Sequence, residues 1–395
     1  MGIRHITRDE YEIANDIKYI AFHRKQDTPK NDADDPDAIY QSLIAYYDEA
    51  GVMTARIRNI DYTILFEGEP VMAGGISGVA SAAEARGRGR VRDILQYVFD
   101  EDHKRGCLFS TLFPFSHAYY RKFGYELCAY QQTVRLPIEQ LSAFAQMPLR
   151  AVLHREADGF DVIREIESRM LHRYNMAMLL TDRQYKKALG GDPVVHGDYR
   201  YILSDPNGTP CAYLYFTAET QDGACCAMVH AMAYTDLQAL KRVLGFLYGL
   251  RAQYATAQLP LPVDVDLLQL LPEPARQVRA SVHPYGMARI LDTQAVLSRL
   301  RHPSGTGAYT IRVLDPTYLP NQGTYAVSYE NGRASVSRTQ LQPDLIVDVG
   351  TLTQLVLGTH ALDSVLWKDS VSLLQNEQTL RAVFVPKPVY FPHHF

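Results

Sequence analysis

The chain has 395 residues, of which 47% are hydrophobic and 21% are charged, and its formal net charge is −4. This length calls for two or three hydrophobic cores, and the composition is that of a globular protein rather than a disordered one. The slight acidity argues against nucleic-acid binding, which usually needs a concentrated basic face, and no apolar run reaches the ~20 residues that cross a bilayer. Because the N-terminus also lacks a signal-peptide core, we expect a cytoplasmic protein that binds neither nucleic acid nor membrane.

The first 140 residues predict a mixed α/β domain. A short strand at residues 3–6 precedes Thr7 and Glu10, which form a capping-box pair at the start of a helix. The residues predicted to face the core from this helix are Ile13, Ile17, Ile20 and Ala21. The strands expected after it are 54–57, 62–66, 71–79, 108–112 and 131–136.

An acidic segment interrupts this domain between Asp27 and Asp37. It contains five aspartates and two prolines, so we expect an exposed loop. Two interpretations stay open. The carboxylates attract a polycationic amine to a nearby site, or they only keep the loop soluble.

Residues 78–92 join a strand to a helix through a segment rich in glycine and arginine. After Gly89 the apolar residues recur with the spacing of one buried helix face, so the helix begins between Arg88 and Val91. Glycines let the backbone approach a ligand closely, and the first N–H groups of a helix have no partner within it. The segment therefore predicts a cradle for a pyrophosphate at the start of a helix.

An aromatic block from Ser116 to Tyr125 follows one helix and one strand later. Together with the cradle it resembles the GNAT acetyltransferases, whose acetyl-CoA loop is Arg/Gln-x-x-Gly-x-Gly/Ala and whose late aromatic segment carries a tyrosine beside the thioester. The match rests on Arg86, Gly89 and Tyr120. Val91 departs from the Gly or Ala of the general pattern.

Residues 151–285 repeat the plan of the first domain without its cradle. Strands are expected at 199–203, 212–216 and 227–231, and a helix with a long apolar face follows Leu237. Where the cradle would stand, the sequence has no glycine, and Thr235 is the expected N-cap of that helix. We interpret this unit as a degenerate, non-catalytic duplicate.

Residues 286–395 predict a small α+β domain. Asn331 and Gly332 form a strong hairpin signal between two short strands, and a short helix is expected to end at Gly358. The chain remains aromatic up to Phe395, where frayed polar ends are usual, so we expect the tail to be docked.

This order, an α/β fold of tandem GNAT-like acyl-CoA N-acyltransferase domains followed by an α+β domain, resembles the enhanced intracellular survival (Eis) family of acetyltransferases. The resemblance implies that the last domain is similar to sterol carrier protein, that the C-terminal carboxylate reaches the first domain's site, and that the protein is a homohexamer. A glutamate precedes the C-terminal residue in mycobacterial members that accept aminoglycosides, whereas this chain has His394 there.

The resemblance also implies roles for single residues. Tyr120 would be the general acid and the α-carboxylate of Phe395 the general base. The residues assigned to the acetyl-CoA site are Val79, Ala80, Ser81, Arg86, Gly87, Arg88, Gly89, Arg90, Val91, Arg92, Phe115 and Ser116. The alternative interpretations make Tyr120 a core aromatic, Phe395 a packing residue and the four arginines a solvated helix face.

The predicted function is acetyl-CoA-dependent transfer of an acetyl group to a primary amine of a polycationic small molecule, such as an aminoglycoside or polyamine, or to a lysine side chain. The alternative is a non-catalytic CoA- or lipid-binding protein with a vestigial acetyl site. We expect no metal, because the five cysteines are odd in number and lack metal-ligand spacing.

Overall fold

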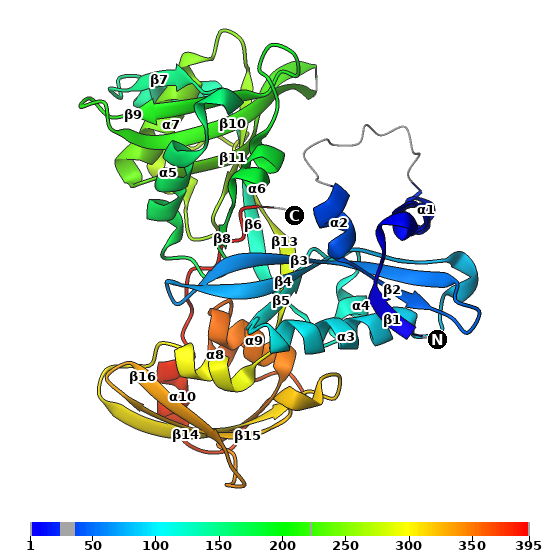
Figure 1. Cartoon of the computed structure of the whole chain (residues 1–395). Coiled ribbons are helices and arrows are strands. Elements are labelled where there is room, and N and C mark those ends of the chain that lie inside the picture. The colour runs from blue at the N-terminus through cyan, green and yellow to red at the C-terminus, as the bar shows by residue number, and fades with distance from the viewer. Residues whose placement is uncertain (1, 24–35, 222, 394–395) are drawn as a thin grey trace. The chain divides into compact units, whose positions relative to one another are not determined.

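The computed structural model describes residues 2–23, 36–221 and 223–393 of the chain. They form two compact units, one made of residues 2–128 and 285–387 and the other of residues 129–284 and 388–393 (Figure 1). None of the helices in these described ranges is long and apolar enough to cross a bilayer.

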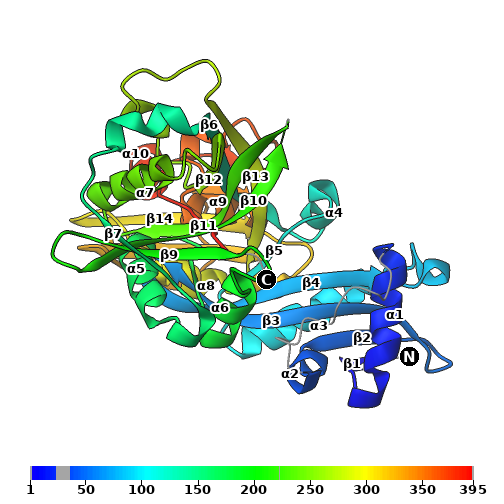
Figure 2. The ribbon, with the colours of Figure 1, turned by 90° about the horizontal axis from the view of Figure 1, so that it is seen from above.

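The first unit contains a mixed sheet in which, among the strands that the structure describes, only β4 and β5 pair in parallel. Its strands, in the order in which they pair (Figure 2), are β1 (Gly2–His5), β2 (Leu43–Tyr47), β3 (Met53–Phe66), β4 (Glu69–Ser81), β5 (Phe109–Leu112) and the end of β13 (Arg279–Ile290). The pairing of β13 with β5, at residues 287–290, is not predicted by the sequence. A strand remote in the sequence therefore completes the sheet of the first domain.

Helices cover both faces of this sheet. On one face, α1 (Tyr11–Ala21) shares a buried cluster with alternate residues of β2. On the other face, α3 (Arg90–Lys104) packs against the remaining residues of β2 and against β3 and β4. This alternation explains why all five residues of β2 are buried. The short α2 (Pro36–Gln41) precedes β2, and α4 (His117–Arg121) follows β5.

The core stripe predicted for the first helix is wrong at two positions. α1 buries Ala14 and Ile17 fully or nearly so, whereas Ile13 and Ile20 are 53% and 67% exposed. A helix can approach a sheet most closely on a face that carries alanine, and the large apolar side chains then lie outside the contact. The predicted capping box is confirmed, since the backbone N–H of Thr7 donates to the carboxylate of Glu10 at 2.8 Å.

β3 is one strand of 14 residues and not the two predicted strands at 54–57 and 62–66. The polar residues between the predicted strands have partners from the turn before β2 and from α3. Arg58 Nε donates to Ser42 Oγ at 3.0 Å, and Asn59 Nδ2 donates to the buried carboxylate of Asp102 at 2.7 Å. The chain can therefore stay extended through the residues that lie between the two predicted strands.

The second unit is also built on paired strands. Its strands, in pairing order, are β6 (Glu126–Pro137), β12 (Thr256–Leu261), β11 (Ala224–Tyr234), β10 (Pro210–Gln221), β9 (Tyr199–Ser204) and β7 (Arg150–Leu153), with β8 (Met178–Leu179) apart from them. Its helices are α5 (Asp161–Leu171), α6 (Asp182–Leu189) and α7 (Leu237–Gly249). The predicted cap of α7 is wrong by one residue. Asp236 caps the helix by accepting from the N–H of Ala239 at 2.8 Å, because a carboxylate accepts there more strongly than the hydroxyl of Thr235.

The C-terminal part of the first unit is a five-stranded sheet with three helices. The strands pair in the order β16 (Arg333–Arg338), β15 (Gly323–Glu330), β14 (Thr306–Leu314), β17 (Leu345–Asp348) and β18 (Ser372–Leu373), and the helices are α8 (Thr293–Arg299), α9 (Val349–Leu357) and α10 (Glu377–Val383). The predicted hairpin at Asn331-Gly332 is confirmed, with φ values of 49° and 87°. The predicted end of the short helix at Gly358 is confirmed as well.

All nine residues of α9 are buried, which no amphipathic pattern would indicate. The helix packs against strand ends of the first domain as well as against its own sheet. Gln354 Nε2 donates to the carbonyl of Leu127 at 2.7 Å, and Thr353 Oγ1 accepts from the N–H of Ile290 at 3.1 Å. A helix enclosed on all sides can be apolar all round.

A fully buried ion pair lies beside α9. Arg289 and Asp315 both have side chains that are 0% exposed, and Arg289 Nη2 donates to Asp315 Oδ2. Arg289 also donates through Nη1 to the carbonyl of Phe123 at 2.6 Å, and its guanidinium lies 4.3 Å from the ring centroid of Phe99. One side chain thus connects β13, α3, the turn after α4 and the segment after β14.

Arg289→Met should lower the free energy of unfolding of the first unit by about 3–5 kcal/mol, because it leaves the Asp315 carboxylate buried without its cation. Urea unfolding of the full chain would measure this. The matched control is Arg381→Met, which removes an arginine from the exposed pair with Asp363 and should leave the free energy of unfolding nearly unchanged. Equal costs for the two variants would contradict the structural role of the buried pair.

Candidate functional site

The edge of β4 opens along its second half. β4 pairs with β5 only over residues 73–76, so residues 77–81 have no neighbour from β5. On its other side β4 stays paired with β3, but the register shifts between Arg56 and Arg58, and Gly78 has a φ of +54°. The shift is a β-bulge: two steps along β3 match three along β4.

The bulge changes which backbone groups face the open edge. Before the bulge, the carbonyl of Met72 accepts from the N–H of Leu108 at 3.0 Å, so the backbone N–H and C=O groups of even-numbered residues point toward β5. After the bulge, the N–H of Ala82 donates to the carbonyl of Thr54 at 2.9 Å, so the backbone N–H and C=O groups of even-numbered residues point toward β3. The N–H groups of Val79 and Ser81 consequently point away from β3 and toward the open edge.

The cradle predicted from the sequence leads from this edge into α3. A short 3-10 turn, Ala83–Ala85, is followed by Gly87 and Gly89, whose φ values are +77° and +76°. Gly89 is the N-cap of α3 and offers no side chain to cap it. The first N–H groups of α3 are therefore available to an anion, and the helix dipole favours one there.

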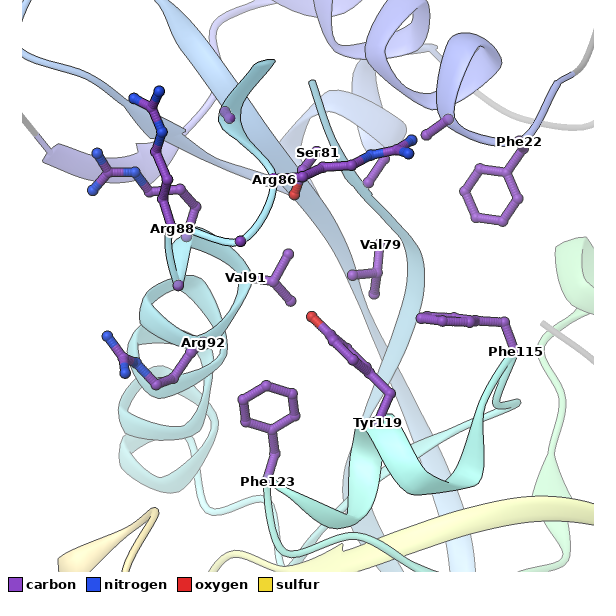
Figure 3. A pocket seen from close by; sticks show the side chains of 16 residues that line it. Phe22, Val79, Ser81, Arg86, Arg88, Val91, Arg92, Phe115, Tyr119 and Phe123 are labelled. Carbon is purple, nitrogen blue, oxygen red and sulfur yellow. The ribbon is translucent and has the colours of Figure 1, made fainter. Parts of the chain in front are cut away.

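The four arginines of the cradle differ in their surroundings. Arg90 lies over the ring of Tyr46, with its guanidinium 4.2 Å from the ring centroid, and donates to the Tyr46 hydroxyl. Arg92 makes an ion pair with Asp93 at 3.2 Å, and Arg86 and Arg88 are exposed at the rim. Three cationic side chains are thus exposed to solvent around the start of α3 (Figure 3).

A cavity of about 590 Å³ runs between the open edge of β4, the cradle and α4 (Figure 3). Every residue assigned to the acetyl-CoA site from the sequence lines it, except Ser116. Ser116 instead caps α4, where its Oγ accepts from the N–H of Tyr119 at 3.3 Å. The lining residues that sequence analysis missed are Ala21, Phe22, Ala85, Tyr119 and Phe123. The i, i+4, i+8 spacing of Phe115, Tyr119 and Phe123 is a signal that would have identified three of the aromatic residues as one wall.

Tyr119 and Tyr120 occupy different environments. The Tyr119 hydroxyl points into the cavity, between Val79 and Val91 (Figure 3). Tyr120 is 3% exposed and belongs to the apolar core between α3 and the sheet, where its ring meets that of Tyr125 edge-to-face at 6.0 Å. Burial raises the pKa of both phenols above the ordinary value, so both keep their protons at neutral pH.

Phe395, assigned as the base, lies outside the described residues, but the tail is described as far as His393. The expectation that the tail is docked is confirmed up to that point. The N–H of Asn175 donates to the carbonyl of Pro388 at 2.9 Å, and the N–H of Tyr390 donates to the carbonyl of Asn175 at 3.1 Å.

A buried carboxylate, Glu167 on α5, holds the end of the described tail. Its Oε1 lies 3.1 Å from His393 Nε2, within hydrogen-bond distance, and the carboxylate accepts from the hydroxyls of Tyr185, at 2.6 Å, and Tyr213. Burial alone would raise the pKa of Glu167, but His393 and the two hydroxyls outweigh burial and hold that pKa below its ordinary value. The tail is therefore held in place at His393.

Comparisons with known proteins agree with this architecture. Residues 2–128 and residues 177–290 each match an acetyltransferase (GNAT) domain, and residues 293–392 match a sterol carrier protein domain. No curated protein sequence matches the chain.

Solved structures match the chain over its whole length. A GCN5-related N-acetyltransferase from Anabaena variabilis has a TM-score of 0.85 at 18% identity, with 100% of each chain covered. A probable N-acyltransferase from Enterococcus faecalis has a TM-score of 0.87 at 19% identity, with 98% of each chain covered. Eis1 from Mycobacterium abscessus has a TM-score of 0.82 at 18% identity, with 100% of each chain covered.

At these identities the structural matches establish the fold, and the domain matches establish the superfamily. The GNAT fold implies an acyl-CoA cosubstrate, and the resemblance to the Eis family is confirmed in fold and in domain order. The chain is a GNAT N-acetyltransferase with two tandem acetyltransferase domains followed by a sterol carrier protein domain.

Proposed function

We propose that the protein transfers the acetyl group of acetyl-CoA to a primary amine, by direct attack within a ternary complex. The acceptor is a polycationic small molecule, such as a polyamine or an aminoglycoside, or a lysine side chain. The observation that carries this proposal is the cavity in which the freed edge of β4 meets the glycine-capped start of α3. From the family resemblance we also propose a homohexamer in the cytoplasm.

The residues of the cavity fit acetyl-CoA by charge and by shape. The N–H groups from Gly87 to Val91 and the exposed arginines of the cradle suit the pyrophosphate and the 3′-phosphate. The N–H of Ser81, on the open edge of β4, suits an amide of the pantetheine arm, as an added strand would, which leaves the N–H of Val79, two residues further from the cradle, for the thioester carbonyl. The aromatic wall of α4 shields the thioester end from water.

Two residues are proposed to move protons. An amine attacks only when neutral, and with an ordinary pKa near 10 it must give up a proton, which the α-carboxylate of Phe395 accepts directly or through water. Tyr120 donates a proton to the departing thiolate. Positioning of the two substrates supplies most of the rate enhancement, and no covalent enzyme intermediate is required.

The first experiment is release of CoA from acetyl-CoA by protein with its native C-terminus, across spermine, aminoglycosides and lysine-rich peptides, with product masses determined. We expect turnover with at least one amine and a product heavier by one acetyl group. The matched control is the same chain with one glycine added after Phe395, which leaves the cradle intact but removes the carboxylate from its place. Binding of acetyl-CoA without turnover on any amine would favour the CoA- or lipid-binding alternative.

Gly89→Ala should weaken CoA binding roughly tenfold, about 1.4 kcal/mol, because alanine resists a φ of +76° and its Cβ would lie 2.9 Å from Arg92 Nη2. Calorimetric titration with CoA would measure the loss. Gly106→Ala is the control: Gly106 has a φ of +82° beyond the other end of α3, with open space around it. An equal loss of affinity in both variants would mean that helix strain, and not the cradle, is responsible.

Tyr120→Phe should lower kcat by about 10²-fold or more while leaving the KM for acetyl-CoA nearly constant, because it removes the proton donor and keeps the ring in the core. Tyr119→Phe, made in parallel, should mainly raise the KM for acetyl-CoA, since the Tyr119 hydroxyl points into the cavity. Steady-state kinetics separates the two effects. The reverse pattern would transfer the role of general acid to Tyr119.

A further inference from the structure

Arg56, on β3, is a buried cation that has no counter-ion among the described residues. It is 2% exposed, and among the residues that the structure describes it takes part in no ion pair and its Nε has no hydrogen-bond partner. Burial, with a smaller contribution from Arg58, lowers the pKa of Arg56 to about 10. An uncompensated buried charge is costly, and replacing it by an apolar residue would cost the fold little. Its presence therefore calls for a functional reason.

The hydrogen bond that Arg56 does make goes to the bulge of β4. Its Nη1 donates to the carbonyl oxygen of Gly78 at 3.2 Å. Arg56 pairs with Ala80, just past the bulge, and both lie on the α1 side of the sheet. A Cβ on Gly78 would lie 2.8 Å from Nη1. Glycine at this position therefore leaves room for the guanidinium and also allows the φ of +54°.

This carbonyl belongs to the same peptide group as the N–H of Val79. Described peptide bonds are trans, so the carbonyl and the N–H of one peptide point in opposite directions in one plane. A donor that fixes the Gly78 oxygen therefore fixes the direction of the Val79 N–H. A charged donor also polarises the peptide, which strengthens the hydrogen bond that its N–H donates.

We propose that Arg56 is a positioning residue that orients and polarises the Gly78–Val79 peptide, so that the Val79 N–H stabilises the thioester oxygen as negative charge develops on it. This inference rests on the proposed acetyl transfer. In that reaction the amine nitrogen forms a bond to the acetyl carbon, the C–S bond breaks and its electron pair leaves on sulfur. The amine loses its proton to the carboxylate of Phe395, and the thiolate receives one from Tyr120. Arg56 touches neither substrate and acts through one peptide group.

The direct test is the carbonyl stretching frequency of acetyl-CoA labelled with ¹³C at the acetyl carbonyl, measured by infrared difference spectroscopy on the complex without an acceptor. Bound to the wild-type protein, the band should lie below its position in free acetyl-CoA. Arg56→Met should lose most of this shift and lower kcat by about 10-fold to 100-fold, below the loss typical for removal of an oxyanion donor itself. The affinity for CoA should change by less than about twofold, because CoA lacks the thioester carbonyl.

Two further variants complete the design. Arg58→Met removes a cation from the same strand and the same face and should leave the band in place. Arg56→Lys keeps the charge on a single donor and should give an intermediate shift, and it replaces Arg56→Met if that variant does not fold.

Each outcome decides the proposal. An unchanged band in the Arg56 variants would overturn it, as would an effect confined to the KM of the acceptor, which would make Arg56 an acceptor-binding residue. Because the band is measured without an amine, a protein that turns over no amine in the panel would refute the proposed function while leaving the role of Arg56 testable.

Discussion

The bulge in β4 is the constraint on which the site depends. A strand has a period of two, so one extra residue reverses the side to which every later backbone group points. Without the extra residue, the N–H groups of Val79 and Ser81 would be used in the ladder with β3. With it, they face an edge that β5 has already left. The binding surface on β4 is thus made of backbone N–H groups, and the side chains of β4 only have to leave space for the ligand.

The opposite wall of the cavity depends on residues far away in the sequence. Phe123 lines the cavity, and its carbonyl is held by Arg289, which is itself neutralised by Asp315. The next residue, Gly124, has a φ of +77°, and a Cβ on it would lie 2.8 Å from a methyl carbon of Val349. The sterol carrier part of the first unit therefore supports the aromatic wall from behind, which gives that part a structural role independent of any ligand.

Local signals in the sequence were sufficient for the features that are themselves local. The cradle, the Asn331-Gly332 hairpin and the repeated domain plan could all be predicted, because glycine positions and apolar periods determine them. The face that α1 buries could not be predicted, because Ala14 is buried by the close approach of the helix to the sheet and not by its own hydrophobicity. The continuity of β3 through Asn59 could not be predicted either, because the partner of Asn59, Asp102, comes from a helix more than forty positions later.

The site was predicted in part for the same reason. The motif identified the cradle residues, but it could not show that Tyr119 faces the cavity while Tyr120 lies in the core, because this depends on how α4 is rotated. Arg56 gave no signal at all. Its importance appears only once its burial and its partner in the bulge are known.

The pairing of β13 with β5 has a consequence for the biogenesis of the protein. During synthesis, the sheet of the first domain emerges from the ribosome with β5 as an open edge, and the strand that covers this edge is not available until Ile290 has been translated. An uncovered edge strand invites pairing with other chains. The nascent chain therefore carries an aggregation-prone edge through the synthesis of the entire second domain, and a fragment ending near residue 140 would retain that edge permanently.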